Sequence, residues 1–249
     1  MRNDSKLSKK RKECIHKFIN SLNINTKYQD ALASTDCNNL MIINEALTHT
    51  SFNNSINHER LEFLGDAVLR LAATNFIEKR FFKMTVGEKS SLRSHLVSDK
   101  WLTKVGKELN IEKVFLVGKK AEHDLSALST LQAEATEALI GAIYECLDNL
   151  NPIIQLLNKF WEIESKKVLA DPHKYNPKSA LQEWTQSNNL KIPIYLVEEI
   201  SKEHGNPKRF VCEVKVSKDI YARGWGGSHK DAEKEAAKNV LKKITQLKL

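Results

Sequence analysis

The sequence contains few of the residues that interrupt regular structure or cross-link a chain. Its 249 residues include only 9 glycines, 5 prolines and 4 cysteines. The cysteines are scattered and form no C-x-x-C pair, which argues against a disulfide framework or a zinc cluster. We therefore expect these thiols to be small buried or incidental residues.

Long hydrophobic runs are also missing. No apolar stretch approaches the ~18–20 residues that a membrane span requires. The first thirteen residues, MRNDSKLSKKRKE, are basic, but no apolar segment follows them, so a secretory signal is not expected. Since 41% of the residues are hydrophobic and 28% are charged, the chain can bury a core. We expect a cytoplasmic protein without membrane contact. Abundant asparagine and lysine leave the plastid stroma as the alternative, if the gene is organellar.

Charge is distributed unevenly along the chain. Residues 166–249 hold 17 basic and 10 acidic residues, whereas residues 13–165 hold 16 basic and 20 acidic residues. The basic C-terminal third indicates a polyanionic partner, and the acidic body indicates cation binding. On charge alone, a protein with an uneven surface and no such partners is an equal alternative.

The first two thirds of the chain have helical periodicity. Apolar residues recur at spacings of three and four in 58–83, 92–109 and 134–160, with almost no glycine or proline. The stretch Gly118–Leu128 is polar and aperiodic, and is expected to be a loop. The pattern predicts an all-α domain of six or seven helices.

The pattern changes after Val168, where two prolines follow within ten residues and indicate a linker. Beyond it the sequence predicts a short helix, three strands and a last helix that begins after Ser228 as N-cap. Their expected ranges are 177–189, Ile192–Ile200, Arg209–Val216, Ile220–Gly226 and 229–246. We predict an all-α domain at 9–165, a linker at 166–174 and a small α+β domain of order α-β-β-β-α at 175–247.

Three carboxylates share one face of the helix predicted at 58–83. Glu59, Glu62 and Asp66 are three and four residues apart, which places them one above another. Like charges so placed repel each other by about 0.2–0.5 kcal/mol per pair at an exposed site. The flanking residues are strongly apolar, so this face is expected at the edge of the core. There the repulsion grows unless a cation compensates it.

A second acidic pair, Glu134 and Glu137, has the same spacing on another predicted helix with apolar or small flanks. Carboxylates from two helices can form an oxygen-lined site for a hard divalent cation, and Mg²⁺ suits such ligands. A solvated face is the usual explanation of a single acidic pair. Two such clusters in apolar surroundings favour the metal site.

Three segments resemble the ribonuclease III family. Residues 58–66 read HERLEFLGD and are similar to the family signature. Residues 46–52, ALTHTSF, are similar to the segment that precedes the signature, and residues 133–141, AEATEALIG, to the second acidic motif. Together the three segments fall within about residues 40–145.

The resemblance implies roles for individual residues. Glu62, Asp66, Glu134 and Glu137 would be metal ligands, with Asp66 and Glu137 the most critical for hydrolysis. Glu59 would contact the substrate or support a dimer. Phe63 would be an aromatic side chain that enters a pocket of the partner subunit, although a plain core residue is the simpler interpretation of a phenylalanine at this spacing.

Three positions depart from the family's usual pattern. His58 stands where the signature usually has asparagine. Glu134 stands where aspartate is usual, which keeps the charge but adds one methylene. Val86 stands where an acidic residue often occurs two positions before the retained Glu88. None of these changes removes a carboxylate from the predicted cluster.

The C-terminal module resembles a double-stranded RNA-binding domain, through Asn176–Glu183 in its first helix and Gly227–Ala237 at its second. Side chains of the first helix can meet 2′-hydroxyls in the wide minor groove of A-form RNA, and basic residues at a helix N-terminus can face phosphates. The residues expected to bind RNA are Ser179, Gln182, Gln186, Asn206, Lys208, His229, Lys230 and Lys234.

Two of those residues also differ from the usual motif. His229 replaces the first residue of a lysine pair, and Asn206 occupies the position where a histidine is common. Histidine is the weaker cation at neutral pH. For any one of the eight residues, ordinary solvated surface is an adequate alternative; the combined pattern favours RNA binding.

Together these features predict a homodimeric endonuclease that cuts double-stranded RNA with Mg²⁺, or Mn²⁺ as a substitute. The resemblance implies products with 5′ phosphates and short 3′ overhangs, and a role in processing rRNA or mRNA precursors. One alternative is a catalytically silent relative that only binds structured RNA. Another is a nuclease that requires a different partner subunit.

Overall fold

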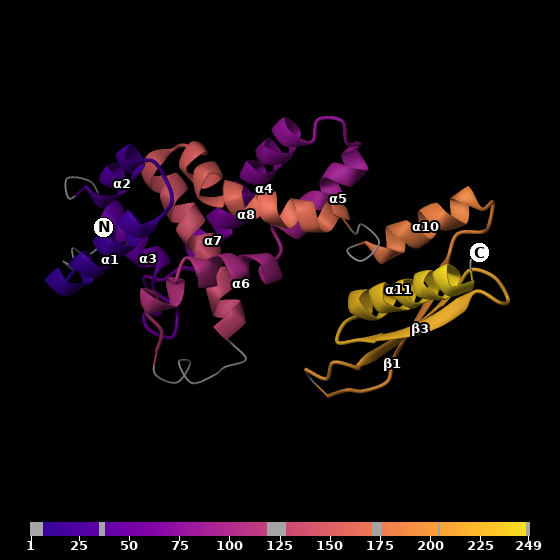
Figure 1. Ribbon diagram of the computed structural model, residues 1–249. Coiled ribbons are helices and arrows are strands. Elements are labelled where there is room, and N and C mark those ends of the chain that lie inside the picture. The colour runs from indigo at the N-terminus through magenta and orange to yellow at the C-terminus, as the bar shows by residue number, and fades with distance from the viewer. Residues whose placement is uncertain (1–6, 35–37, 119–127, 171–175, 204, 248–249) are drawn as a thin grey trace. The chain divides into compact units, whose positions relative to one another are not determined.

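The computed structural model describes residues 7–34, 38–118, 128–170, 176–203 and 205–247. The chain divides into two compact units, Met1–Ser165 and Lys166–Leu249. Figure 1 colours the first from indigo to salmon and the second from orange to yellow. Among the described residues, no helix has the length and apolar character that crossing a membrane requires.

The described part of the first unit is helical, which confirms the predicted all-α domain. It contains eight α-helices and one 3₁₀ turn, compared with the six or seven helices expected. They are α1 (Lys9–Ser21), α2 (Thr26–Ala33), α3 (Asn39–Ala46), α4 (Glu59–Arg80), α5 (Val86–Leu96), α6 (Asp99–Glu108), η1 (Ile111–Lys113), α7 (Leu128–Leu147) and α8 (Asn151–Ala170).

Two of the long helices predicted from periodicity are each divided in two. The stretch 92–109 is interrupted at Val97-Ser98, where the Ser98 hydroxyl accepts a hydrogen bond from the amide of Trp101 and starts α6. The stretch 134–160 is interrupted at Asp148, whose φ of 44° is left-handed. Both breaks are local capping and turn features, to which apolar periodicity is insensitive. Residues 119–127 of the predicted loop lie outside the described residues.

Helices α4 and α7 form the centre of the first unit. They pack against each other more extensively than any other pair of elements, and α3 and α6 also pack on α7. One face of α4 buries apolar side chains such as Leu61, Leu69 and Phe76. The acidic residues at the start of α4 are thereby held at the edge of this core, as the apolar flanks predicted.

The second unit has the predicted α-β-β-β-α order. Its elements are α10 (Pro177–Ser187), β1 (Ile194–Glu199), β2 (Phe210–Lys215), β3 (Tyr221–Gly226) and α11 (His229–Leu247). The strands form an antiparallel sheet in the order β1-β2-β3. Helix α11 packs on β2 and β3, and α10 packs against α11 (Figure 1).

Alternation along β2 builds the core of this small unit. Phe210, Cys212 and Val214 are buried and face the helices, where they meet alanines and Val240 of α11. The Ser228 hydroxyl accepts a hydrogen bond from the amide of Asp231 at 3.2 Å, which confirms the predicted N-cap of α11.

The linker predicted at 166–174 is partly wrong. Helix α8 continues to Ala170, so the first five residues of that segment are helical. The last residue of this helix is Ala170. Residues 171–175 lie outside the described residues.

Candidate functional site

The two acidic helices cross in direct backbone contact. A Cβ atom added to Gly65 of α4 would lie 1.9 Å from the carbonyl oxygen of Glu137, and one added to Gly141 of α7 would lie 2.1 Å from that of Leu61. Packed helices are normally about 8–10 Å apart because side chains separate them. Glycine on both sides of the crossing removes these side chains, and so brings the acidic faces of α4 and α7 together.

A pocket opens at this crossing. Its walls come from α4, α7 and the segment before α4, and its lining residues are His49, Thr50, His58, Glu59, Glu62, Phe63, Asp66, Glu134 and Glu137. A second pocket shares Glu62, Glu134 and Glu137 and adds Asp99, the first residue of α6. The structure thus brings together all four carboxylates that the sequence analysis assigned to a metal site.

Burial and mutual repulsion change the proton affinities of these carboxylates. Burial, followed by the negative charges of Asp66, Glu62 and Asp99, raises the pKa of Glu137 to about 7. Burial, and then the charge of Glu134, also raises the pKa of Glu62. A cluster that resists ionisation in this way lacks positive charge, which a divalent cation would provide.

One arginine partly compensates the cluster. Arg70, one turn after Asp66 on α4, places its Nε 2.9 Å from both oxygens of the Asp66 carboxylate. This hydrogen bond raises the pKa of Arg70. The Asp66 carboxylate is therefore oriented by Arg70, and both side chains are substantially exposed.

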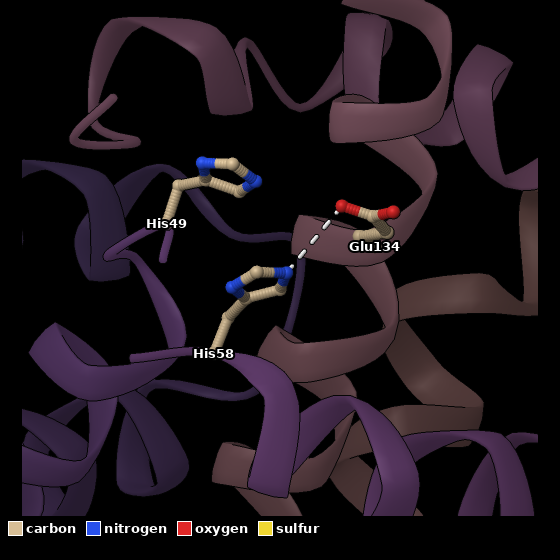
Figure 2. Close-up of side chains that lie close together, drawn as sticks. All are labelled: His49, His58 and Glu134. Carbon is tan, nitrogen blue, oxygen red and sulfur yellow. Dashed lines mark ion pairs between the residues drawn. The ribbon is translucent and has the colours of Figure 1, made fainter. Parts of the chain in front are cut away.

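A buried histidine bridges the acidic residues of the two helices. His58 is the N-cap residue of α4, and its side chain is 3% exposed. Its Nε2 lies 3.4 Å from an oxygen of Glu62. It is also 3.4 Å from an oxygen of Glu134 (Figure 2). This contact with His58 holds the pKa of Glu134 below its usual value.

A second histidine lies against the first. The rings of His49 and His58 are stacked with centroids 5.1 Å apart, and both contact the edge or face of Phe115. Burial, and then the proximity of His58, lowers the pKa of His49. Both imidazoles are on the same side of the pocket and face the carboxylate of Glu134 from α7 (Figure 2).

Several residues of this site were not identified from the sequence. His49 lies in the quoted segment ALTHTSF, but no role was assigned to it. Asp99 comes from a separate helix, and Arg70 is an ordinary exposed residue by pattern. The i,i+4 spacing of Asp66 and Arg70 was the one signal available, and such pairs are common on helices that have no site.

Arg60 of the signature has a structural role. Its Nε is 2.9 Å from Glu45 of α3, and its Nη2 is 3.2 Å from Glu145 of α7. These hydrogen bonds raise its pKa. Arg60 therefore fastens the first turn of α4 to both neighbouring helices, on the side of α4 away from the cluster's carboxylates.

The two residues expected to support substrate or dimer contacts both line the pocket. Glu59 is exposed at the start of α4. The Phe63 side chain is 85% exposed, so its interpretation as a plain core residue is wrong. A single exposed apolar side chain is common on protein surfaces, so its exposure makes Phe63 available for a contact with another molecule without showing one.

The retained acid Glu88 has a capping role. Its carboxylate accepts hydrogen bonds from the amide of Thr85 at 2.7 Å and from the Thr85 hydroxyl at 2.9 Å, forming a capping box at the start of α5. These hydrogen bonds lower its pKa. Val86, at the position where an acid is often found, is 84% exposed and follows this cap directly.

In the second unit, the residues predicted to bind RNA are mostly accessible. Ser179, Gln182 and Gln186 are exposed along one face of α10, opposite the buried Ala180 and Leu181. Lys230 and Lys234 are exposed one turn apart at the start of α11. His229 is also exposed, and its ring packs edge-on against Phe210 at 4.4 Å.

Asn206 is less available than the sequence suggested. Its side-chain nitrogen donates hydrogen bonds to the Ser201 hydroxyl at 3.3 Å and to the Glu203 carboxylate at 3.1 Å. Its side-chain oxygen accepts a hydrogen bond from the backbone amide of Lys208 at 2.9 Å. These contacts organise the loop between β1 and β2. Lys208 itself is exposed at the end of that loop.

Comparisons with known proteins agree with both halves of the structure. A family model described as Ribonuclease-III-like matches residues 39–151, and one described as Double-stranded RNA binding motif matches residues 177–244. The chain is 53% identical to Ribonuclease 3 of Prochlorococcus marinus over 96% of each protein. It is 37% identical to Ribonuclease 3 2 of Nostoc sp. over 82% of this chain and 84% of that protein.

A solved structure is also similar. The nuclease domain of ribonuclease III from Campylobacter jejuni shares 32% identity, with a TM-score of 0.46, over 56% of this chain and 94% of that one. The sequence matches define a helical nuclease joined to a double-stranded RNA-binding domain. The chain belongs to the ribonuclease III family and is an endoribonuclease of double-stranded RNA. That family depends on a metal ion, and the acidic pocket of this chain is suited to one.

Proposed function

We propose that the chain hydrolyses double-stranded RNA with Mg²⁺ held by Glu62, Asp66, Glu134 and Glu137. The observation that carries this proposal is the crossing of α4 and α7, where four carboxylates from two helices line one pocket. Their oxygen atoms are the ligands that Mg²⁺ prefers, and Mn²⁺ accepts the same set. The raised pKa values of Glu62 and Glu137 support the fit, because burial and then neighbouring negative charge oppose ionisation of these carboxylates, and a bound cation would favour it.

Individual residues of the chain would have distinct roles in this reaction. Mg²⁺, when bound, supplies the positive charge that activates the attacking water and stabilises the leaving 3′ oxygen. Asp66 and Glu137 lie on facing helices and would both hold the ion, and Arg70 orients the Asp66 carboxylate. Cleavage of this kind leaves a 5′ phosphate on the product.

The proposal includes a homodimer in which each subunit cuts one strand and leaves short 3′ overhangs. Phe63 supports it, because this side chain is 85% exposed beside the acidic pocket. The similar nuclease domain from Campylobacter jejuni has a structurally flexible region that is involved in its own dimer formation. A cytoplasmic location and precursors of rRNA and mRNA as natural substrates remain predictions from the sequence.

The C-terminal unit would hold the duplex. The exposed Ser179, Gln182 and Gln186 are spaced to meet 2′-hydroxyls from one helix face, and Lys230 and Lys234 to meet phosphates. Lys208 and His229 would extend this surface. We assign Asn206 to loop organisation rather than to RNA contact, because its side chain is already bonded within the loop.

The test is cleavage of a long RNA duplex with and without Mg²⁺, followed by mapping of the product ends. Asp66→Asn and Glu137→Gln should each reduce cleavage at least about 100-fold and leave duplex binding nearly unchanged, because an amide keeps the shape but loses the charge that holds the cation. Glu112→Gln, at an exposed acid outside the pocket, is the matched control.

Cleavage by Asp66→Asn or Glu137→Gln at a rate near that of the parent would contradict the metal assignment. A parent that binds the duplex but never cuts it, with either ion, would instead support the silent RNA-binding alternative. Cleavage that appears only after a second protein is added would support the requirement for a different partner subunit.

A further inference from the structure

Beside the carboxylate cluster lies a group of three side chains with a different donor chemistry. His49, His58 and Glu134 each place one ligand atom so that all three atoms lie within 4.8 Å of one another (Figure 2). The His58 Nε2 is 3.4 Å from the Glu134 carboxylate. Ligands at about 2.0–2.1 Å from a tetrahedral Zn²⁺ are about 3.4 Å from each other, so this pair already has the required separation.

Packing holds the two imidazoles in place before any ion binds. Their rings are stacked, with an interplanar angle of 29°, and Phe115 packs against both. His58 is nearly completely buried, and Phe115 is buried as well. Because little side-chain freedom remains to be lost on ligation, the entropic cost of forming a site here is small.

The hydrogen bonds of the rings leave suitable atoms for an ion. The Nδ1 of His49 accepts a hydrogen bond from the amide of Ser51 at 3.1 Å and lies 2.8 Å from the Ser51 hydroxyl, and these contacts orient Nε2 toward Glu134 (Figure 2). An ion bound at Nε2 would require the ring proton on Nδ1, from where it can be donated to the Ser51 hydroxyl, as the second nitrogen of a metal-binding histidine commonly does. In the described part of the chain, the buried Nδ1 of His58 has no partner. Its Nε2 faces the carboxylates of Glu62 and Glu134, so an ion that binds there would displace the proton that this nitrogen shares with them.

The donor set distinguishes this group from the carboxylate cluster. Two imidazole nitrogens and one carboxylate oxygen suit Zn²⁺ and similar transition metals, whereas Mg²⁺ prefers oxygen ligands and retains its waters. Glu62, 3.4 Å from the His58 Nε2, can provide a further oxygen. The two sites share Glu134, so an ion bound by the histidines would withdraw this carboxylate from the cluster.

We propose that His49, His58 and Glu134 form a second site, overlapping the carboxylate cluster at Glu134, for a divalent transition metal with Zn²⁺ as its preferred ion, and that its occupation inhibits the nuclease. The binding site follows from the three side chains alone. The inhibition rests on the function proposed above, because it requires Glu134 to serve the Mg²⁺ site.

Co²⁺ tests the binding site without any measurement of cleavage. Its visible d–d bands distinguish ligation by imidazole in a site of low coordination number from weak octahedral binding by oxygen. Full-length protein is titrated with Co²⁺ without Mg²⁺, because Mg²⁺ would compete for the shared Glu134, and octahedral Co²⁺ at the carboxylates contributes only weak bands. The parent should show the intense bands of nitrogen ligation. His49→Asn and His58→Asn should each weaken the affinity at least about tenfold, since even an outer-shell change costs about 10–100-fold.

His16→Asn, at a half-buried histidine of α1 outside this group, is the matched control and should titrate as the parent does. Should His58→Asn fail to fold, His49→Asn still decides the matter, because His49 is only partly buried. Equal affinity and spectrum in the parent and the His49 variant would overturn the proposal. So would a parent spectrum dominated by sulfur-to-cobalt charge transfer, which would locate the ion at a cysteine.

Inhibition is measured separately, as the Zn²⁺ concentration that halves Mg²⁺-dependent cleavage, with each variant normalised to its own rate without Zn²⁺. The midpoint should rise at least about tenfold in His49→Asn and stay at the parent value in His16→Asn. Equal midpoints in all three proteins would overturn the inhibitory role. A parent that does not cleave with Mg²⁺ alone would refute the proposed function and leave the Co²⁺ result valid.

Discussion

Two individual residues in contact explain how this chain accommodates its departures from the family pattern. His58 replaces the usual asparagine and Glu134 replaces the usual aspartate, and the structure places their side chains 3.4 Å apart. The carboxylate of Glu134 lies beside the imidazole of His58, and this contact lowers the pKa of Glu134. Neither substitution is conservative alone, but together they form one contact between α4 and α7.

Glu137 is the residue at which the acidic pocket most affects stability. Its pKa of about 7 in the folded protein lies above the ordinary value of 4.5, so ionisation opposes folding. In metal-free protein, the free energy of unfolding should therefore fall as the pH rises from about 4.5 to 7. After allowance for solvent screening at this half-buried site, the loss is about 1–2 kcal/mol.

Glu137→Gln should remove that part of the pH dependence and make the metal-free protein more stable than the parent above pH 7. The measurement is thermal unfolding in a chelator across this pH range, repeated with Mg²⁺. The added ion should stabilise the parent and have a smaller effect on the variant. If the free energy of unfolding of the parent is constant between pH 4.5 and 7, ionisation of Glu137 does not oppose folding and this prediction is wrong.

At the scale of the elements, the decisive feature is the close crossing of α4 and α7. Gly65 and Gly141 lie against carbonyl oxygens of the opposite helix, and Arg60 ties α4 to α3 and α7 nearby. The acidic residues occupy the turns on either side of this crossing. Their mutual distances are therefore set by the backbone, which is stiffer than side-chain rotamers.

Gly65→Ala should separate the two helices, because its Cβ would meet the Glu137 carbonyl oxygen at 1.9 Å. We expect a loss of about 1–3 kcal/mol in the free energy of unfolding, and a larger proportional loss of cleavage because the carboxylates move apart. Gly87→Ala is the control. A Cβ atom added at this exposed helical glycine would meet no other atom within 4 Å, so alanine there should stabilise α5 by about 0.5–1 kcal/mol.

Chemical unfolding and duplex cleavage of both variants check this prediction. If Gly65→Ala unfolds and cleaves like the parent, the helices can move apart at little cost, and the crossing does not determine the geometry of the pocket.

At the scale of the whole molecule, the boundary between the two folded units coincides with the change from an acidic to a basic part of the sequence. The C-terminal residues 166–249 carry 17 basic and 10 acidic residues, and this unit presents exposed lysines at the start of α11. The first unit contains the acidic pocket. The polyanion is thus expected to bind mainly through the second unit, while cleavage depends on the first.

Removal of the second unit should weaken duplex binding and confine cleavage to low ionic strength, since fewer cations remain to face phosphates. The truncation should end after Ala170, where α8 ends, because a stop after Ser165 cuts the helix and removes the buried Val168. Circular dichroism and cleavage at several salt concentrations compare the two fragments. A 1–170 fragment that unfolds, or that cleaves at high salt like the parent, would contradict this division of roles.

The sequence by itself predicted which carboxylates form the acidic cluster and on which helices they lie. The spacing of Glu59, Glu62 and Asp66 defined one helix face, and alternation along 210–216 identified a strand. Such periodicities are local, because a few neighbouring residues contain them completely. For the same reason the sequence missed the breaks at Ser98 and Asp148, which depend on a cap and on a left-handed turn.

Only the tertiary structure decided which helix faces meet. Glu62 and Glu137 are far apart along the chain, and periodicity shows that each lies on an acidic face without showing that the faces share a pocket. The crossing at Gly65 and Gly141 settles this point, and the same packing brings His49 and Asp99 to the cluster from other segments. Long-range contacts of this kind depend on shape and on backbone approach across the core, and no local pattern encodes them.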